Sequence, residues 1–240
     1  MLATAFTASS KPVHLKSAPV PSRCSASDPL ADHLVAGPSL TFDAQEHIFR
    51  EGDPVSYIYK VEAGHVCVYR MMSDGRRQVI DFAFAGDIVG LGALGTHTAN
   101  AQATTKSRLR RIPTSALHEA MRTDQRLGSK LYEAMSWKLL AARELLFAVS
   151  QRTATERLAG FLLALSRRNE RRGEDASEIV LPMSRIDIAD YLGLTIETVS
   201  RTFSKFRAAG LIDIEQCILV TICDAQALAA VADGTREVGA

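Results

Sequence analysis

The chain has 240 residues, 47% of them hydrophobic and 23% charged, and a formal net charge of +1 at pH 7. This composition is typical of a soluble globular protein, and the length suffices for one large domain or two ordinary ones. No apolar run approaches the roughly 18 residues of a membrane-spanning helix. Because the chain as a whole is not basic, any nucleic-acid site must be a local patch of cationic side chains.

The cysteines, Cys24, Cys67, Cys217 and Cys223, are widely separated, and none forms a C-x-x-C pair or has a histidine at metal-ligand spacing. We therefore expect a cytoplasmic protein in a reducing environment, without structural disulfides or a metal site. Cys67 and Cys223 are predicted to be buried as small hydrophobic residues.

Residues 1–27 are rich in Ser, Ala and Pro and contain no acidic residue. Such a composition is found in organelle transit peptides and also in disordered leaders of bacterial proteins. The segment lacks the arginine-rich amphipathic character of typical transit peptides, so the disordered leader is favoured. We predict a weakly ordered tail over residues 1–35.

Residues 40–112 contain short apolar segments that are separated by glycine turns, with no helical stretch between them. The pair Asp74-Gly75, between VCVYRMM and RQVIDFAF, predicts a tight hairpin. Alternating side chains on either side of such turns are typical of strands half buried in a small barrel or roll. We predict an all-β roll over residues 36–120.

The apolar period becomes helical after residue 114. TSALHEAMR predicts a short helix behind a Ser/Thr cap, and DQRLGSKLYEAMSWKLLAARELLFAVSQ predicts a long helix covering residues 121–150. Its apolar residues repeat at intervals of 4 and 3, with a second stripe alongside, which is more apolar surface than one neighbour would cover. We predict that this helix pairs with its copy in a homodimer, whereas the alternative is a helix buried in its own chain. The predicted dimer contacts are Leu131, Met135, Leu139, Ala142, Leu146 and Val149.

Residues 151–240 predict a second domain that contains a helix–turn–helix. An amphipathic helix ended by Gly173 and a short strand, EIVLP, precede the segment RIDIADYLGLTIETVSRTFSKF. Gly193 supplies the sharp turn and Ala189 is small where the two helices cross. Thr202 departs from the motif, which usually has Ile, Val or Leu there. A final hairpin, turning near Glu215-Gln216, completes a winged helix–turn–helix, so the whole chain is expected to be α+β.

The second helix of this motif places Glu197, Ser200 and Arg201 on one face, at i, i+3 and i+4, opposite Val199 and Phe203. In the major groove of DNA a carboxylate accepts from cytosine N4, and an arginine donates twice to guanine O6 and N7. The alternative is a solvated Glu197–Arg201 ion pair, but the surrounding motif favours base contacts. DNA backbone contacts are predicted for Ser184, Arg185, Thr195, Thr198 and Lys205.

REGD, YKVEAGHVCVYRMMSDGRRQVIDFAFAGDIVGL, the long helix and the helix–turn–helix follow one another in an order that resembles the Crp/Fnr family of transcription regulators. The resemblance covers residues 40–230, and DIADYLGLTIETVSRTF is most similar to the FixK branch. It implies an N-terminal roll, a central dimerisation helix and a C-terminal winged helix, and a homodimer that binds double-stranded DNA and RNA polymerase, mainly as an activator of low-oxygen genes. The arrangement of Glu197, Ser200 and Arg201 goes with TTGAT…ATCAA half-sites, whereas Ile196 stands where the Crp branch has Arg.

Two effectors known in the family are not expected here. Nucleotide-binding members hold the ribose with a Glu and the phosphate with an Arg, but this chain has Leu91 at the Glu position and no cation in Thr98-Ala99-Asn100. A buried phosphate without a cationic partner would be strongly destabilised. An iron–sulfur cluster needs about four protein ligands, and the chain offers only Cys24 in its N-terminal segment and Cys67 in the predicted roll.

The remaining alternative is a haem- or metabolite-responsive regulator, because the scattered histidines neither indicate nor exclude haem ligation. Cys217, near the predicted wing turn, is a candidate redox thiol. No nucleophile–base pair, metal cluster or phosphate-binding loop suggests an enzyme. The favoured hypothesis, from the FixK resemblance, is a regulator without cofactor whose DNA binding needs no small molecule.

Overall fold

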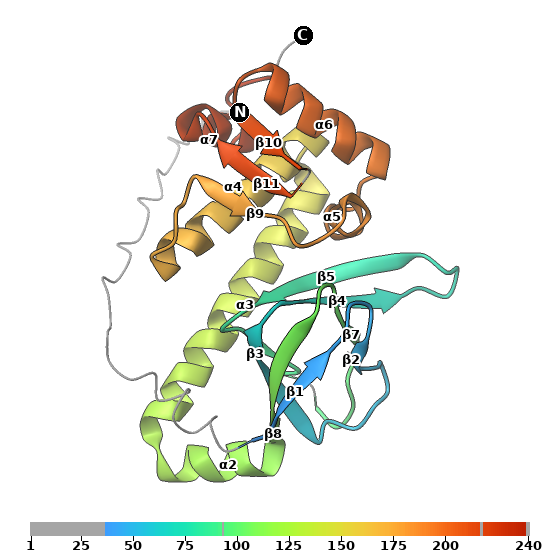
Figure 1. Cartoon of the computed structure of the whole chain (residues 1–240), viewed down its shortest axis with the longest axis vertical. Coiled ribbons are helices and arrows are strands. Elements are labelled where there is room, and N and C mark those ends of the chain that lie inside the picture. Colours follow the sequence, from blue (N-terminus) through green and yellow to red (C-terminus); the bar gives the residue numbers. More distant parts are fainter. Residues whose placement is uncertain (1–36, 93, 217, 239–240) are drawn as a thin grey trace, which may run out of the picture.

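The computed structural model describes residues 37–92, 94–216 and 218–238. An N-terminal β-roll and a C-terminal helical domain lie at the two ends of the molecule, with one long helix running alongside both (Figure 1). The tail predicted over residues 1–35 and the candidate thiol Cys217 lie outside the described residues. Within the described ranges, no helix is both long and apolar enough to cross a membrane.

The roll consists of two four-stranded antiparallel sheets, in the orders β1-β8-β3-β6 and β2-β7-β4-β5. The strands are β1 (Ser39–Phe42), β2 (His47–Phe49), β3 (Tyr57–Ala63), β4 (His65–Met71), β5 (Arg77–Phe84), β6 (Ile88–Val89), β7 (Asn100–Ala103) and β8 (Ser107–Pro113). Alternate side chains of these strands, such as Val61, Val66 and Leu109, are fully buried between the sheets. The predicted all-β architecture of the roll is therefore confirmed, and its last strand ends at Pro113.

The β4–β5 hairpin turns at Asp74-Gly75, as predicted. Gly75 has a left-handed backbone, with φ of 85°, which glycine adopts without a steric penalty. The Met72 amide donates to the Arg76 carbonyl at 2.8 Å, and the Asp74 carboxylate accepts from the Arg76 amide at 3.0 Å. The turn chemistry of two residues thus suffices to place this hairpin.

Cys67 in β4 is only 1% exposed, which confirms its predicted burial. Burial raises the pKa of its thiol to about 12, so the sulfur stays protonated and unreactive at neutral pH. The corresponding prediction for Cys223 is wrong, because this residue is exposed. Ile222 immediately before it takes the inward-facing position of the strand, and successive side chains of a strand point to opposite faces.

A buried histidine lies in the roll next to strand β2. His97 is 4% exposed and stacks on Phe49 with ring centroids 3.7 Å apart. Burial lowers the pKa of His97 from its ordinary value of 6.5, against the opposing charge of Asp53. The unfolded chain therefore binds more protons than the folded chain near and below pH 6.5. The contribution of neutral, buried His97 to the free energy of unfolding is thus fully present above that pH and is lost as the pH falls.

We expect the free energy of unfolding, measured by urea denaturation, to fall between pH 7.5 and pH 5.5 partly through His97. His97→Phe keeps an aromatic ring against Phe49 but cannot be protonated, so it should reduce this pH dependence. His118→Phe is the control, since His118 is exposed on the surface. Equal pH dependence in the wild type and in His97→Phe would show that His97 does not contribute.

Two helices follow the roll: α2 (Thr114–Thr123) and α3 (Gln125–Gln151). The predicted Ser/Thr cap of α2 is wrong, because its N-cap is Pro113 and makes no side-chain hydrogen bond. The Thr114 hydroxyl instead donates to the carbonyls of Val55 and Ser56, both at 3.2 Å, and so ties α2 to the roll. Asp124 separates the two helices and caps α3 by accepting from the Arg126 amide at 2.8 Å.

The C-terminal domain has its own core, built around Leu158, Leu162, Phe206 and Leu228. Its elements are α4 (Ala154–Arg172), β9 (Glu178–Val180), α5 (Arg185–Leu192), α6 (Ile196–Ala208), β10 (Ile212–Glu215), β11 (Leu219–Ile222) and α7 (Ala225–Ala232). Strands β10, β11 and β9 form an antiparallel sheet in that order. Together with the roll and α3, this domain confirms the predicted α+β architecture.

Helix α7 is an addition to the predicted elements. Asp224 caps it by accepting from the Ala227 amide at 2.8 Å, and its apolar residues join the core that α4 also lines. The cap followed by the strong helix formers AQALAAVA was a readable signal.

Candidate nucleic-acid interface

The helix–turn–helix is formed by α5 and α6 and is held by local hydrogen bonds. Ser184 and Asp187 form a capping box at the start of α5. Gly193 ends that helix in a left-handed conformation, with φ of 64°, and the Leu194 amide donates to the Ala189 carbonyl at 2.9 Å. Thr195 then caps α6 by accepting from the Thr198 amide at 3.2 Å. These residues set the angle at which α6 leaves the turn.

One face of α6 is anchored in the domain core. Val199 and Phe206 are fully buried and Phe203 is 3% exposed. Thr202 is also buried, and its hydroxyl donates to the Thr198 carbonyl one turn back at 2.8 Å. A threonine is tolerated at this apolar position because its hydroxyl is satisfied within the helix.

Helix α6 lies at the upper right in Figure 1. Glu197, Ser200 and Arg201 are exposed on the face of this helix opposite the core. The Arg201 guanidinium lies 3.5 Å from the Thr198 hydroxyl, and no ion pair joins it to Glu197 or to another carboxylate of the described chain. Hydrogen bonds from the Glu197 amide and the Thr195 hydroxyl, with a smaller effect of Arg201, lower the pKa of Glu197. Glu197 is therefore a charged acceptor at neutral pH, beside a guanidinium with free donors.

The predicted DNA backbone contacts surround this face and have different local roles. The Ser184 hydroxyl donates to the Asp187 carboxylate at 2.7 Å, and the hydroxyls of Thr195 and Thr198 lie 3.0 Å apart. Arg185 stacks over the Phe203 ring at 3.5 Å, whereas Lys205 is exposed on α6. Their contacts with phosphates stay a prediction.

Helix α3 presents a long apolar surface to solvent. Of its 27 residues only Leu127 and Leu131 are buried. Leu131 packs with Leu117 and Leu127 in the core between the roll and the helices. Its side chain is therefore covered by its own chain and is not exposed for the predicted contact with a second copy. The other large residues of the predicted stripe are exposed, at 39% for Met135, 53% for Leu139, 70% for Leu146 and 37% for Val149, as is Ala142.

Further large residues of α3, which the heptad pattern missed, are exposed beside this stripe: Tyr132, Trp137, Leu140 and Phe147. An exposed apolar surface of this extent is typical of a protein–protein interface. The pairing of α3 with its copy stays a prediction.

The roll also contacts the first helix of the helix–turn–helix. Arg77 in β5 pairs with Asp187 and, through Nε at 2.8 Å, with Asp190, and Gln78 donates to the Asp190 carbonyl at 2.5 Å. Phe82 packs beside Tyr191, with ring centroids 5.2 Å apart. These contacts leave no pattern in the sequence, because Arg77 and Asp190 are 113 positions apart.

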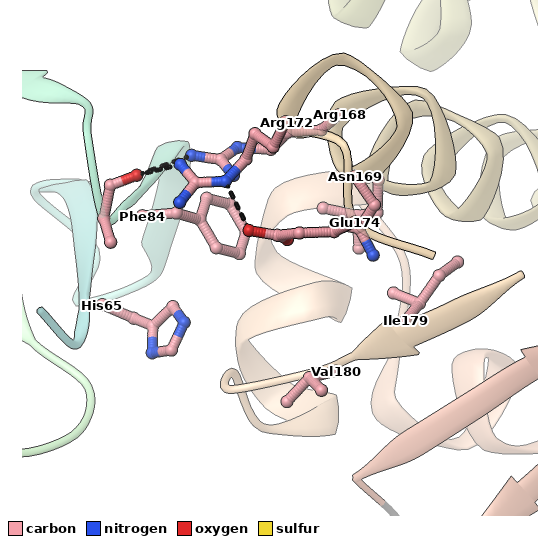
Figure 2. Close-up of a pocket in the computed structure, with 10 residues that line it drawn as sticks. His65, Phe84, Arg168, Asn169, Arg172, Glu174, Ile179 and Val180 are labelled. Carbon is pink, nitrogen blue, oxygen red and sulfur yellow. Dashed lines mark hydrogen bonds and ion pairs between the residues drawn. The ribbon is translucent and has the colours of Figure 1, made fainter. Parts of the chain in front are cut away.

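A cleft of about 200 Å³ opens between the roll and α4, and its lining includes His65, Phe84, Arg168 and Arg172 (Figure 2). Arg172 donates to the Ala85 carbonyl and pairs with Glu174 at 2.8 Å. Arg168 stacks over Phe84 at 4.3 Å and pairs with Asp87 at 3.0 Å. Both guanidinium groups are therefore engaged with the chain itself, so they serve to join the two domains.

Comparison with known proteins agrees with this geometry. The model of the cyclic nucleotide-binding domain matches residues 39–124, and the model of the Crp-like helix-turn-helix domain matches residues 156–231. Electron transport regulator A of Shewanella oneidensis is 34% identical over 179 residues, which cover 74% of this chain and 72% of that protein. The fumarate and nitrate reduction regulatory protein of Escherichia coli is 34% identical over 193 residues, covering 80% and 77%.

Among solved structures, FixK2 from Bradyrhizobium japonicum is 34% identical and superimposes with a TM-score of 0.77, over 82% of this chain and 98% of that one. The long helix α3 lies between the segments that the two family models match. The relatives are regulators, which agrees with the expectation that the chain is not an enzyme. The chain belongs to the Crp/Fnr family of DNA-binding transcription regulators, with FixK2 among its structural neighbours.

Proposed function

We propose that this protein is a homodimeric transcription regulator, mainly an activator, that binds TTGAT…ATCAA-like palindromes in the cytoplasm. The observation that carries the proposal is the exposed face of α6, where Glu197, Ser200 and Arg201 stand together on a helix anchored by Val199 and Phe206. In the major groove, the Glu197 carboxylate can accept from cytosine N4 and the Arg201 guanidinium can donate to guanine O6 and N7, so the two suit a G·C pair and its neighbour. As an activator it would also contact RNA polymerase.

The apolar surface of α3 supports the homodimer in this proposal. Two copies joined along α3 would place two α6 helices on one face of the DNA, one helical turn apart, and so read a palindrome. Leu139 and Leu146 are 53% and 70% exposed in the described chain, so pairing with a second copy along α3 would remove apolar surface from water. Burying such side chains contributes roughly 25 cal/mol per Å² of apolar surface.

DNA binding without a cyclic nucleotide forms part of the proposal. Leu91 packs with the core between the roll and α2, so no carboxylate is available at this position for a ribose. The Asn100 amide oxygen accepts from the Glu51 backbone at 3.2 Å, and neighbouring Ala99 is 6% exposed. The Asn100 amide is thus hydrogen-bonded within the chain, and Thr98-Ala99-Asn100 offer no cation for a phosphate.

Control of low-oxygen genes is proposed from the relatives, which include fumarate and nitrate reduction regulatory proteins. Regulation in this chain is proposed to work without an iron–sulfur cluster. Its Cys67 is buried with a raised pKa, and Cys24 is the single cysteine among the first 35 residues. Cluster ligation needs about four protein ligands, usually thiolates.

The test is a binding titration of protein purified in air, without added ligand, against a TTGAT…ATCAA duplex at a stated salt concentration. The control duplex has its guanines and their paired cytosines exchanged. We expect specific binding with a dissociation constant of about 10⁻⁸ M or tighter, and clearly weaker binding to the control. Equal binding to the two duplexes would contradict the proposed operator, and recovery only with haem, a nucleotide or reductant would contradict ligand-free binding.

A further inference from the structure

Arg157, in the first turn of α4, joins three separate segments through backbone carbonyls. Its Nε donates to the Arg152 carbonyl at 2.8 Å, and Nη2 donates to the Val149 carbonyl at 2.8 Å. Nη1 donates to the Leu192 carbonyl at 3.0 Å and lies 3.4 Å from that of Gly193. One guanidinium therefore connects the last turn of α3, the α3–α4 linker and the turn of the helix–turn–helix.

The acceptors of Arg157 lie at the C-terminal ends of two helices. Helices leave their last carbonyls without intrahelical partners, and these carbonyls carry the negative end of the helix dipole. A planar guanidinium with several N–H donors can satisfy carbonyls in different directions at once, which a lysine ammonium cannot reproduce with the same geometry. Arg157 thus links the ends of α3 and α5 directly.

The end of α3 also packs closely against the turn before α6. A Cβ placed on Gly193 would lie 3.5 Å from Val149 Cγ1 and 3.7 Å from Arg157 Nη1. Only Arg152 and Thr153 separate α3 from α4. The direction of α6 relative to α3 therefore depends on a short connection that Arg157 spans.

We propose that Arg157 is a positioning residue that fixes α6 relative to α3 and thereby sets the distance between the two recognition helices of a dimer. This inference rests on the proposed function, because it requires two copies joined through α3 on one palindrome. Arg157 selects half-site spacing through the orientation of the domain and does not contact a base.

The experiment compares Arg157→Ala and Arg157→Lys with Arg167→Ala, a control on an exposed residue of the same helix. Each full-length protein is titrated against the TTGAT…ATCAA duplex and against duplexes whose spacer is one base pair longer or shorter. If Arg157→Ala reduces the correctly oriented population to about one-tenth, the apparent dissociation constant on the natural spacing rises about 10-fold.

The wild type and Arg167→Ala should bind the altered spacers much more weakly than the natural one, whereas Arg157→Ala should lose most of this preference. Arg157→Lys should fall between them, since it keeps a cation near the helix ends. The slope of the logarithm of affinity against the logarithm of salt concentration should stay unchanged, because Arg157 is not expected to contact a phosphate. Loss of a phosphate contact would lower the magnitude of this slope by about one.

Circular dichroism and size-exclusion chromatography establish that each variant is folded and has the oligomeric state of the wild type. Wild-type spacing preference in a folded Arg157→Ala variant would overturn the positioning role, as would a lowered salt slope. Failure of the wild type to prefer the TTGAT…ATCAA duplex at any spacing would instead contradict the proposed function.

Discussion

Replacing Leu139 and Leu146 together by aspartate is expected to convert the protein into a monomer and to weaken operator binding by about 1,000-fold, within the range that joining two binding modules provides. Both leucines are largely exposed on α3, at 53% and 70%. In a dimer paired through α3 the substitutions would place carboxylates in an apolar interface, where an unpaired charge is strongly unfavourable. Multi-angle light scattering would give the mass in solution, and a duplex titration would give the affinity.

Leu94→Asp is the matched control for this prediction, because Leu94 is 94% exposed but belongs to a loop of the roll. It should keep the mass and the DNA affinity of the wild type. A dimer that survives the double substitution in α3 would show that another surface joins the two copies. Loss of DNA binding with an intact dimer would likewise contradict the assignment of α3.

Arg201→Ala is expected to cost about 1–3 kcal/mol of binding free energy on the TTGAT…ATCAA duplex and to relax the preference for guanine. The guanidinium is exposed on α6 and has one weak contact, at 3.5 Å to the Thr198 hydroxyl. Its removal should therefore leave the domain core intact. Titrations against duplexes substituted at each position of the half-site would locate the position at which discrimination is lost.

Two further variants separate base recognition from phosphate binding. Glu197→Ala should relax the preference at a single position, since Glu197 is a charged acceptor with a lowered pKa. Lys205→Ala should weaken binding to all duplexes alike and lower the salt slope by about one. If Arg201→Ala weakens binding equally on every duplex, Arg201 binds a phosphate and does not read a base.

The contacts between the roll and the C-terminal domain give the roll a structural connection to DNA binding. Arg77 pairs with two carboxylates of α5, and Arg168 of α4 pairs with Asp87 at 3.0 Å. The roll is also joined to α3, since Lys138 pairs with Asp81 at 2.6 Å. The helix–turn–helix is therefore held both by α3, through Arg157, and by the roll, so its orientation reflects the packing of the whole chain.

The sequence alone determined the features that depend on short-range chemistry. The Asp74-Gly75 turn and the glycine at position 193 each act within a few residues, so the type of residue predicts the backbone. The period of the apolar residues likewise separated the buried face of α6, with Val199 and Phe203, from its exposed face. These local rules sufficed to predict the roll, the helix–turn–helix and the residues that α6 presents.

Only the tertiary structure decided which groups meet across the fold. Leu131 continues the apolar surface of α3 in the sequence, but packing against Leu117 buries it in its own chain. The Thr114 hydroxyl at the start of α2 donates to a carbonyl of the roll and does not cap the helix, whose N-cap is Pro113. Arg157 binds backbone carbonyls, which every residue has, so its partners leave no pattern of residue types to be read. Such contacts depend on the distance between segments in space, which local periodicity and propensity do not encode.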